Sequence, residues 1–101
     1  MPNVSPLSKR LKEAREAAGL SQKQLGIKAG IDEFSASARM NQYEAGKHTP
    51  DYLTLSKLAK VLKVPTAYFY AENDILAKII TYCALLNKKE LDEILRQIKS
   101  T

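Results

Sequence analysis

A chain of 101 residues, 45% of them hydrophobic, is long enough for one small domain, and four glycines with four prolines are too few for a strand-and-turn protein. The net charge is +5, and residues 1–30 hold six basic against two acidic side chains, while residues 64–101 hold five of each. This asymmetry favours an anionic partner at the N-terminal end, nucleic acid rather than a membrane. The single cysteine excludes an internal disulfide and a Cys-based zinc site.

The sequence contains no membrane segment that we can identify. Its most hydrophobic run, Ile75 to Leu86, is interrupted by Lys78 and Thr81. The run is well below the roughly 20 apolar residues that a membrane span needs, and no secretory signal precedes it. We therefore expect a cytoplasmic protein, in agreement with the low cysteine content.

The N-terminal third predicts two helices. Leu7 to Ala18 carries apolar residues at helical spacing and is followed by Gly19, which suits a left-handed helix terminator. Ser21 to Gln24 has the pattern of a capping box and opens a short helix that stops at Gly30. Gly26 lies inside this helix, where the lack of a side chain would let a neighbouring helix approach closely.

The next stretch, Gly30 to Pro50, is poor in large apolar residues. We expect three elements in it: an extended turn, Ile31 to Phe34; a helix, Ser35 to Ala45; and a polar loop, Lys47 to Thr49. Ser35 is the expected N-cap of the helix, with Asp32 as the alternative. Met40 and Tyr43 are expected to face the core.

The following part of the chain also predicts helices. Thr49-Pro50 has the form of a helix start, and the buried stripe of that helix comprises Leu53, Leu55, Leu58, Ala59 and Leu62. Val64-Pro65 ends it, and Thr66 to Tyr70 forms one further turn or short helix. Its three aromatic side chains suit core packing better than a ligand pocket.

Residues 74–99 predict a helical hairpin with a wide apolar face, in which Asp74 caps the first helix and Asn87 opens the second through a capping box. We expect this face to form a homodimer; packing over the aromatic turn of the same chain is the alternative. The expected dimerisation residues are Ile75, Ile79, Cys83, Leu86, Leu91, Ile94, Leu95 and Ile98. The fold class is all-α, with about seven helices.

Several segments occur in an order that resembles one known family. They are Arg10-Leu11-Lys12-Glu13-Ala14-Arg15, Gly19-Leu20-Ser21-Gln22-Lys23-Gln24-Leu25, Tyr43-Glu44-Ala45-Gly46, and Leu55 to Pro65. Together they resemble the phage repressor/Cro-type family, also called the XRE family, over roughly residues 7–72. The resemblance implies a five-helix lambda-repressor-like helix-turn-helix domain, which we place at residues 1–72. The C-terminal helical hairpin, placed at residues 73–101, lies outside the resemblance. Between Gly30 and Glu44 the chain is two residues longer than the commonest family spacing.

The resemblance also implies double-stranded DNA as the partner and assigns candidate contacts. The base-reading candidates are Ser37, Ala38, Arg39, Asn41 and Gln42. Asn and Gln can pair with adenine, and an Ala methyl can pack on thymine; an ordinary solvated helix surface is the alternative. The phosphate-contact candidates are Gln22, Lys23, Lys47 and His48. Arg15 and Glu44 resemble the buried ion pair that ties the first helix of such domains to the recognition helix.

These features predict a sequence-specific DNA-binding transcriptional regulator, a repressor that binds a pseudo-palindromic operator as a dimer. The alternative is a protein-interaction module, antitoxin-like or a coactivator-type adaptor, with a protein partner. We expect no enzyme, because the sequence has no Cys/His pair, HExxH motif or glycine-rich phosphate loop. We also expect no cofactor and no metal, since His48 has no second ligand at a suitable spacing.

Overall fold

The computed structural model describes residues 5–101 and contains only helices within that range. In chain order these are α1 (Leu7–Ala17), α2 (Gln22–Lys28), α3 (Glu33–Glu44), α4 (Tyr52–Leu62), the 3-10 helix η1 (Thr66–Tyr70), α5 (Asp74–Cys83) and α6 (Lys88–Lys99). The all-α class is therefore confirmed. The first four residues of the domain expected at 1–72 lie outside the described residues, and its boundaries stay a prediction.

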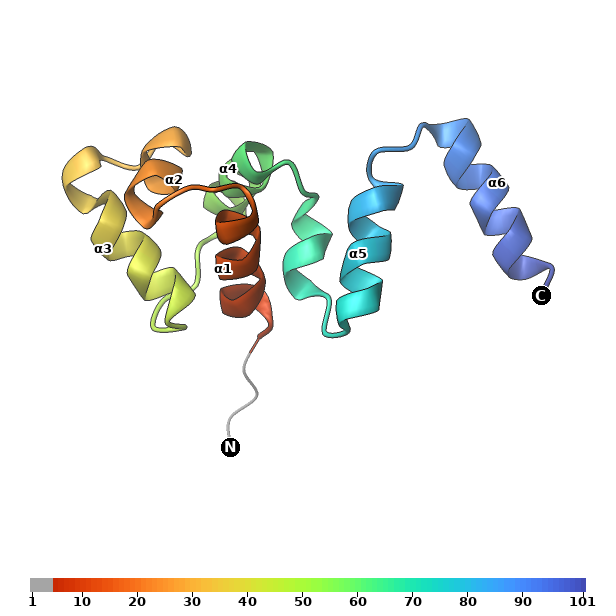
Figure 1. Ribbon diagram of the computed structural model, residues 1–101, viewed down its shortest axis with the longest axis horizontal. Coiled ribbons are helices and arrows are strands. Elements are labelled where there is room, and N and C mark those ends of the chain that lie inside the picture. Colours follow the sequence, from red (N-terminus) through yellow and green to blue (C-terminus); the bar gives the residue numbers. More distant parts are fainter. Residues whose placement is uncertain (1–4) are drawn as a thin grey trace.

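The core is shared by the first four helices and η1. α1 packs against both α3 and η1 and lies between them (Figure 1), and α2 packs against α3 and α4. The largest side chains that are fully buried come from five different elements: Leu11, Leu25, Met40, Leu55, Leu58 and Phe69. Burial of one such side chain contributes about 1.5–3 kcal/mol, and this shared core holds the domain together.

The helix ends of the N-terminal half follow from local chemistry that the sequence already indicates. Gly19 has a φ of +70° directly after α1, a backbone conformation that favours glycine. The capping box before α2 has both of its bonds: the Gln24 N–H donates to the Ser21 hydroxyl at 3.0 Å, and the Ser21 N–H donates to the Gln24 side chain at 2.8 Å.

Two helix starts differ from the prediction because a better side-chain cap lies nearby. α4 begins after Asp51, whose carboxylate accepts from the Thr54 N–H at 2.8 Å, rather than at Thr49-Pro50. α5 is capped by Asn73 instead of Asp74, and the Asn73 side chain accepts from two backbone N–H groups. Leu53 was expected in the buried stripe of α4, but it is 64% exposed because it lies in the first turn, on the outer side.

The two C-terminal helices are present as expected, but they diverge. α5 packs on η1 through the buried Ala77, whereas α6 has no buried residue and points away from the rest of the molecule (Figure 1). The molecule is accordingly elongated, with extents of 51 × 34 × 22 Å. None of the helices in residues 5–101 is long and apolar enough to cross a membrane.

Candidate nucleic-acid interface

The helix that carries the expected base-reading residues begins two residues earlier than predicted. Asp32, not Ser35, is the N-cap of α3: its backbone is not yet helical, and its carboxylate accepts from the Phe34 N–H at 3.0 Å. Glu33 and Phe34, which the prediction placed in an extended turn, form the first turn of the helix. The two additional residues thus lengthen the front of α3 and leave the preceding turn short.

α3 has one buried and one exposed side. Ala36, Met40 and Tyr43 are buried, which agrees with the predicted inward positions of Met40 and Tyr43. The five expected base-reading residues are all exposed: Ser37, Ala38, Arg39, Asn41 and Gln42. Their side chains are small or polar, so this side of the helix can enter a narrow space and offer hydrogen bonds there.

A close helix crossing holds α3 in place. A Cβ atom added to Gly26 of α2 would lie 2.9 Å from the Cβ of Ala36 and 3.2 Å from its Cα atom. Real Cβ atoms do not approach so closely, and glycine therefore permits the spacing of α2 and α3. The turn between the two helices contains Gly30, whose φ of +91° any larger side chain would strain.

A second constraint acts at the other end of α3. The Arg15 Nε donates to Glu44 Oε2 at 2.6 Å and its Nη2 donates to Oε1 at 3.0 Å, a two-bond pairing. The third guanidinium nitrogen donates to the Leu20 carbonyl at 2.9 Å. The hydrogen bonds that Arg15 donates to Glu44 raise the pKa of Arg15 above its ordinary value. Only 13% and 4% of the two side chains are exposed, so this pair fixes the end of α3 to α1.

The four candidate phosphate-contact residues differ in how accessible their side chains are. Gln22 donates its side-chain amide to Glu44 Oε1 at 3.2 Å, which places it in the ion-pair network at the start of α2. Lys23, Lys47 and His48 are exposed, Lys23 beside Gln22 and the other two in the loop after α3. The phosphate role of these four residues stays a prediction; Lys23, Lys47 and His48 have the better access.

The prediction missed Phe34, a large apolar side chain that is 91% exposed in the first turn of α3. It was missed because the helix was expected to begin after it. The alternative N-cap, Asp32, is the correct one, and a helix that begins after Asp32 includes Phe34.

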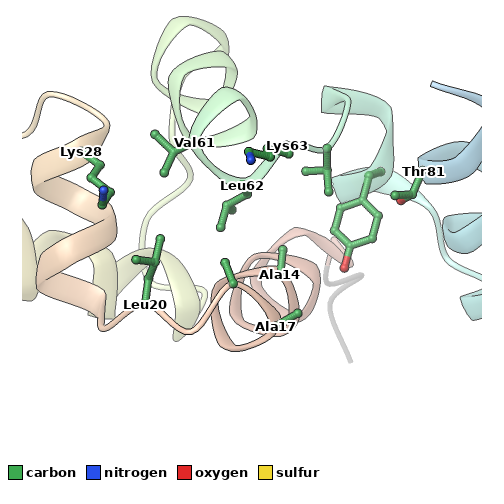
Figure 2. A pocket seen from close by; sticks show the side chains of 11 residues that line it. Ala14, Ala17, Leu20, Lys28, Val61, Leu62, Lys63 and Thr81 are labelled. Atoms are coloured by element: carbon green, nitrogen blue, oxygen red, sulfur yellow. The ribbon is translucent and has the colours of Figure 1, made fainter. Parts of the chain in front are cut away.

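An open cavity of about 560 Å³ lies away from the exposed side of α3 (Figure 2). The C-terminal end of α1 and the turn that follows it form one wall, and the C-terminal end of α4 forms another. Alanine, leucine and valine side chains form most of its wall, with Lys28 and Lys63 near its edge and Thr81 of α5 on the far side. The residues that line it include no carboxylate, histidine or cysteine. Its mostly aliphatic wall suits an apolar contact.

The described residues also contain no group of three or more His, Cys, Asp or Glu side chains that could hold a metal ion. Cys83 is half-buried and has a free thiol.

Comparison with known proteins agrees with this geometry. A family model described as a helix-turn-helix domain matches residues 8–75. The chain is 36% identical over 93 residues to the HTH-type transcriptional regulator ImmR of Bacillus subtilis (strain 168), which is 92% of this chain and 68% of that protein. It is 43% identical over 63 residues to the uncharacterized HTH-type transcriptional regulator RghRB of the same organism, 61% of this chain and 42% of that protein.

The solved structure of the transcriptional regulator BswR shares 50% sequence identity with the chain and has a TM-score of 0.82, with 94% of each chain covered. This match includes the C-terminal helices as well as the helix-turn-helix part. The chain therefore belongs to the XRE-type helix-turn-helix family of transcriptional regulators, the family that its sequence resembles.

Proposed function

We propose that this regulator binds a pseudo-palindromic DNA operator as a homodimer and represses transcription. The exposed side of α3 carries the proposal: Ser37, Ala38, Asn41 and Gln42 lie on it, and the other side is packed into the core. In helix-turn-helix proteins the second helix of the motif enters the major groove, where such side chains can read base edges.

Electrostatics support the same orientation. α1 and α2 carry most of the net positive charge of the chain, and the exposed Lys23 and Lys47 flank the two ends of the helix-turn-helix unit. Contacts from these lysines to phosphates would position α3 without reading sequence. Because each such contact releases counterions, affinity should fall steeply as salt is raised.

A dimer is proposed because one recognition helix reads few base pairs and because α5 and α6 leave apolar side chains uncovered. Ile75 is 68% exposed and Ile98 is 64% exposed, although both lie on the apolar faces of their helices. Two copies joined through these helices would present two α3 helices to half-sites about 34–36 Å apart. Repression is the proposed sign, since a bound dimer of this size can block access of other proteins to the DNA.

Selection of bound sequences from a random DNA pool tests the proposal. We expect an enriched motif with two-fold symmetry and a fixed half-site spacing. Gln42→Ala should lose about 1–3 kcal/mol of binding to the selected operator and relax its sequence preference at one position. Lys47→Ala is the matched control: it should weaken all sequences alike and lower the salt slope by about 1. A pool without an enriched motif would contradict the proposal.

A further inference from the structure

Phe34 is the most exposed of the large hydrophobic side chains in the described part of the chain, at 91%. Its backbone lies in the first turn of α3, where the Phe34 N–H donates to the Asp32 carboxylate at 3.0 Å. The side chain is not part of the hydrophobic core. The ring lies on the helix that carries the candidate base-reading residues, and it is exposed to a partner that contacts them.

The corrected start of α3 gives Phe34 a definite register. Phe34, Ser37, Ala38 and Asn41 are spaced i, i+3, i+4 and i+7, so they share one side of the helix. Ala36, Met40 and Tyr43 occupy the opposite, buried side. A surface that contacts Ser37 and Ala38 will therefore also meet the Phe34 ring, one turn nearer the N-terminus of α3.

We propose that Phe34 packs on the C5-methyl group of a thymine in the major groove and thereby determines part of the operator sequence. This inference rests on the proposed function. The N-terminal residues of a recognition helix are those that contact base edges, and an apolar side chain there can recognise the thymine methyl. Asp32 and Glu33 directly precede Phe34 and are negatively charged, which disfavours a position of the ring against the phosphate backbone and favours one over the bases.

Replacement of single thymines by deoxyuridine tests this contact, because it removes only the C5-methyl group. Binding of the selected operator is measured by fluorescence anisotropy at one salt concentration, with each thymine replaced in turn. Wild-type protein should lose about fourfold in affinity at one thymine of each half-site, the effect of one buried methyl group. Phe34→Ala should bind the unmodified operator about tenfold more weakly and should no longer respond to deoxyuridine at that position.

Three controls separate this effect from loss of structure and from other contacts. Leu53→Ala also truncates an exposed apolar side chain, but on α4, and should leave both affinity and the deoxyuridine profile unchanged. Thermal unfolding of Phe34→Ala should match that of the wild type, since the ring is not part of the core. Ala38→Gly should leave the response at that thymine unchanged, because the methyl group of Ala38 lies one turn further along α3.

The outcomes are distinct. An operator that shows no methyl-sensitive thymine, or a Phe34→Ala profile identical to the wild-type profile, overturns the role of Phe34 and leaves the proposed function intact. A random pool without an enriched sequence overturns both. The contact is established if Phe34→Ala, and neither Leu53→Ala nor Ala38→Gly, loses the response to deoxyuridine at one thymine.

Discussion

The guanidinium group of Arg10 lies 2.9 Å from the carboxylate of Asp74 and joins α1 to the first turn of α5. Its Nε also donates to the Ala71 carbonyl at 2.9 Å, and its Nη1 donates to Glu13 at 3.1 Å. Burial lowers the pKa of Arg10, but the hydrogen bonds that it donates to Asp74 and Glu13 outweigh burial and raise that pKa above its ordinary value. With 3% of its side chain exposed, Arg10 fixes the direction in which α5 leaves the domain.

Substitution Arg10→Met should destabilise the protein by about 1–3 kcal/mol. The methionine keeps the apolar stem of the side chain but removes the donor of the buried Ala71 carbonyl, whose desolvation is then uncompensated. Urea unfolding followed by circular dichroism measures the change. Lys9→Met is the control, because Lys9 also faces Asp74 but is 63% exposed, and its loss should stay within about 0.5 kcal/mol. Equal effects of the two substitutions would contradict a structural role for Arg10.

The same contact should make stability sensitive to acid. The hydrogen bond from Arg10, helped by the charge of Lys9, holds the pKa of Asp74 below its ordinary value of 3.8. A carboxyl whose pKa is lower in the folded state stabilises the protein above its unfolded pKa and loses that contribution as pH falls through the folded pKa. Wild type should therefore exceed Asp74→Asn in urea midpoint near neutral pH, and the difference should vanish below the folded pKa. A difference that persists unchanged at acidic pH would be the contrary result.

Glu44→Gln should cost about 3 kcal/mol of stability. The substitution keeps the shape of the side chain but leaves the Arg15 guanidinium, only 13% exposed, without its counter-charge. Asp92→Asn is the matched control, since it breaks the exposed Arg96–Asp92 pair one turn apart on α6 and should change stability by less than about 0.5 kcal/mol. If both variants unfold at the wild-type urea concentration, the buried pair does not hold α3 in place.

Gly26→Ala should destabilise the helix-turn-helix unit although alanine is the better helix former. The added methyl group would lie 2.9 Å from Ala36, and separating α2 from α3 costs about 1–3 kcal/mol, against a propensity gain of about 1 kcal/mol or less. Ala36→Gly removes the opposing methyl group, so the double variant should recover part of the loss. Additive effects of the two substitutions in thermal unfolding would argue against a direct contact.

The helix-turn-helix part of the fold was predictable from local sequence patterns, because its helices end at glycines or begin at side-chain caps. Gly19 follows α1 with a positive φ, and Ser21 and Gln24 form a capping box before α2, both as predicted. Three helix starts were misplaced, before α3, α4 and α5. In each case an Asp or Asn lay close to the chosen residue, and the choice between neighbouring capping residues depends on backbone angles that a residue pattern does not contain.

The sequence predicted the exposed residues in the middle of α3, but it did not predict how far the helix extends at its start. The exposed side of α3 follows from helical spacing once Met40 and Tyr43 are taken as inward. Phe34 was lost with the start of the helix, and the buried role of Arg10 gave no local signal, since its partners Ala71 and Asp74 are about sixty residues away in the sequence. Whether a charged residue is buried depends on such distant contacts, and spacing alone does not reveal them.

The divergence of α5 and α6 leads to a prediction about assembly. Leu95 is 53% exposed on the apolar face of α6, and this helix has no buried residue of its own. Leu95→Glu should therefore leave the fold intact by circular dichroism. Placing a charge in the proposed dimer interface should weaken association by about 100-fold or more, equivalent to about 3 kcal/mol.

Light scattering after size-exclusion chromatography measures that association. At micromolar concentration we expect the mass of two chains for the wild type and of one chain for Leu95→Glu. Gln97→Glu adds the same charge at an exposed position outside the apolar face of α6, and should remain dimeric. Operator affinity should fall with dimerisation in the first variant only, because a monomer engages one half-site at a time. A wild-type chain that is monomeric under these conditions would leave α6 open to a partner of different sequence and would favour a protein-interaction role for this surface.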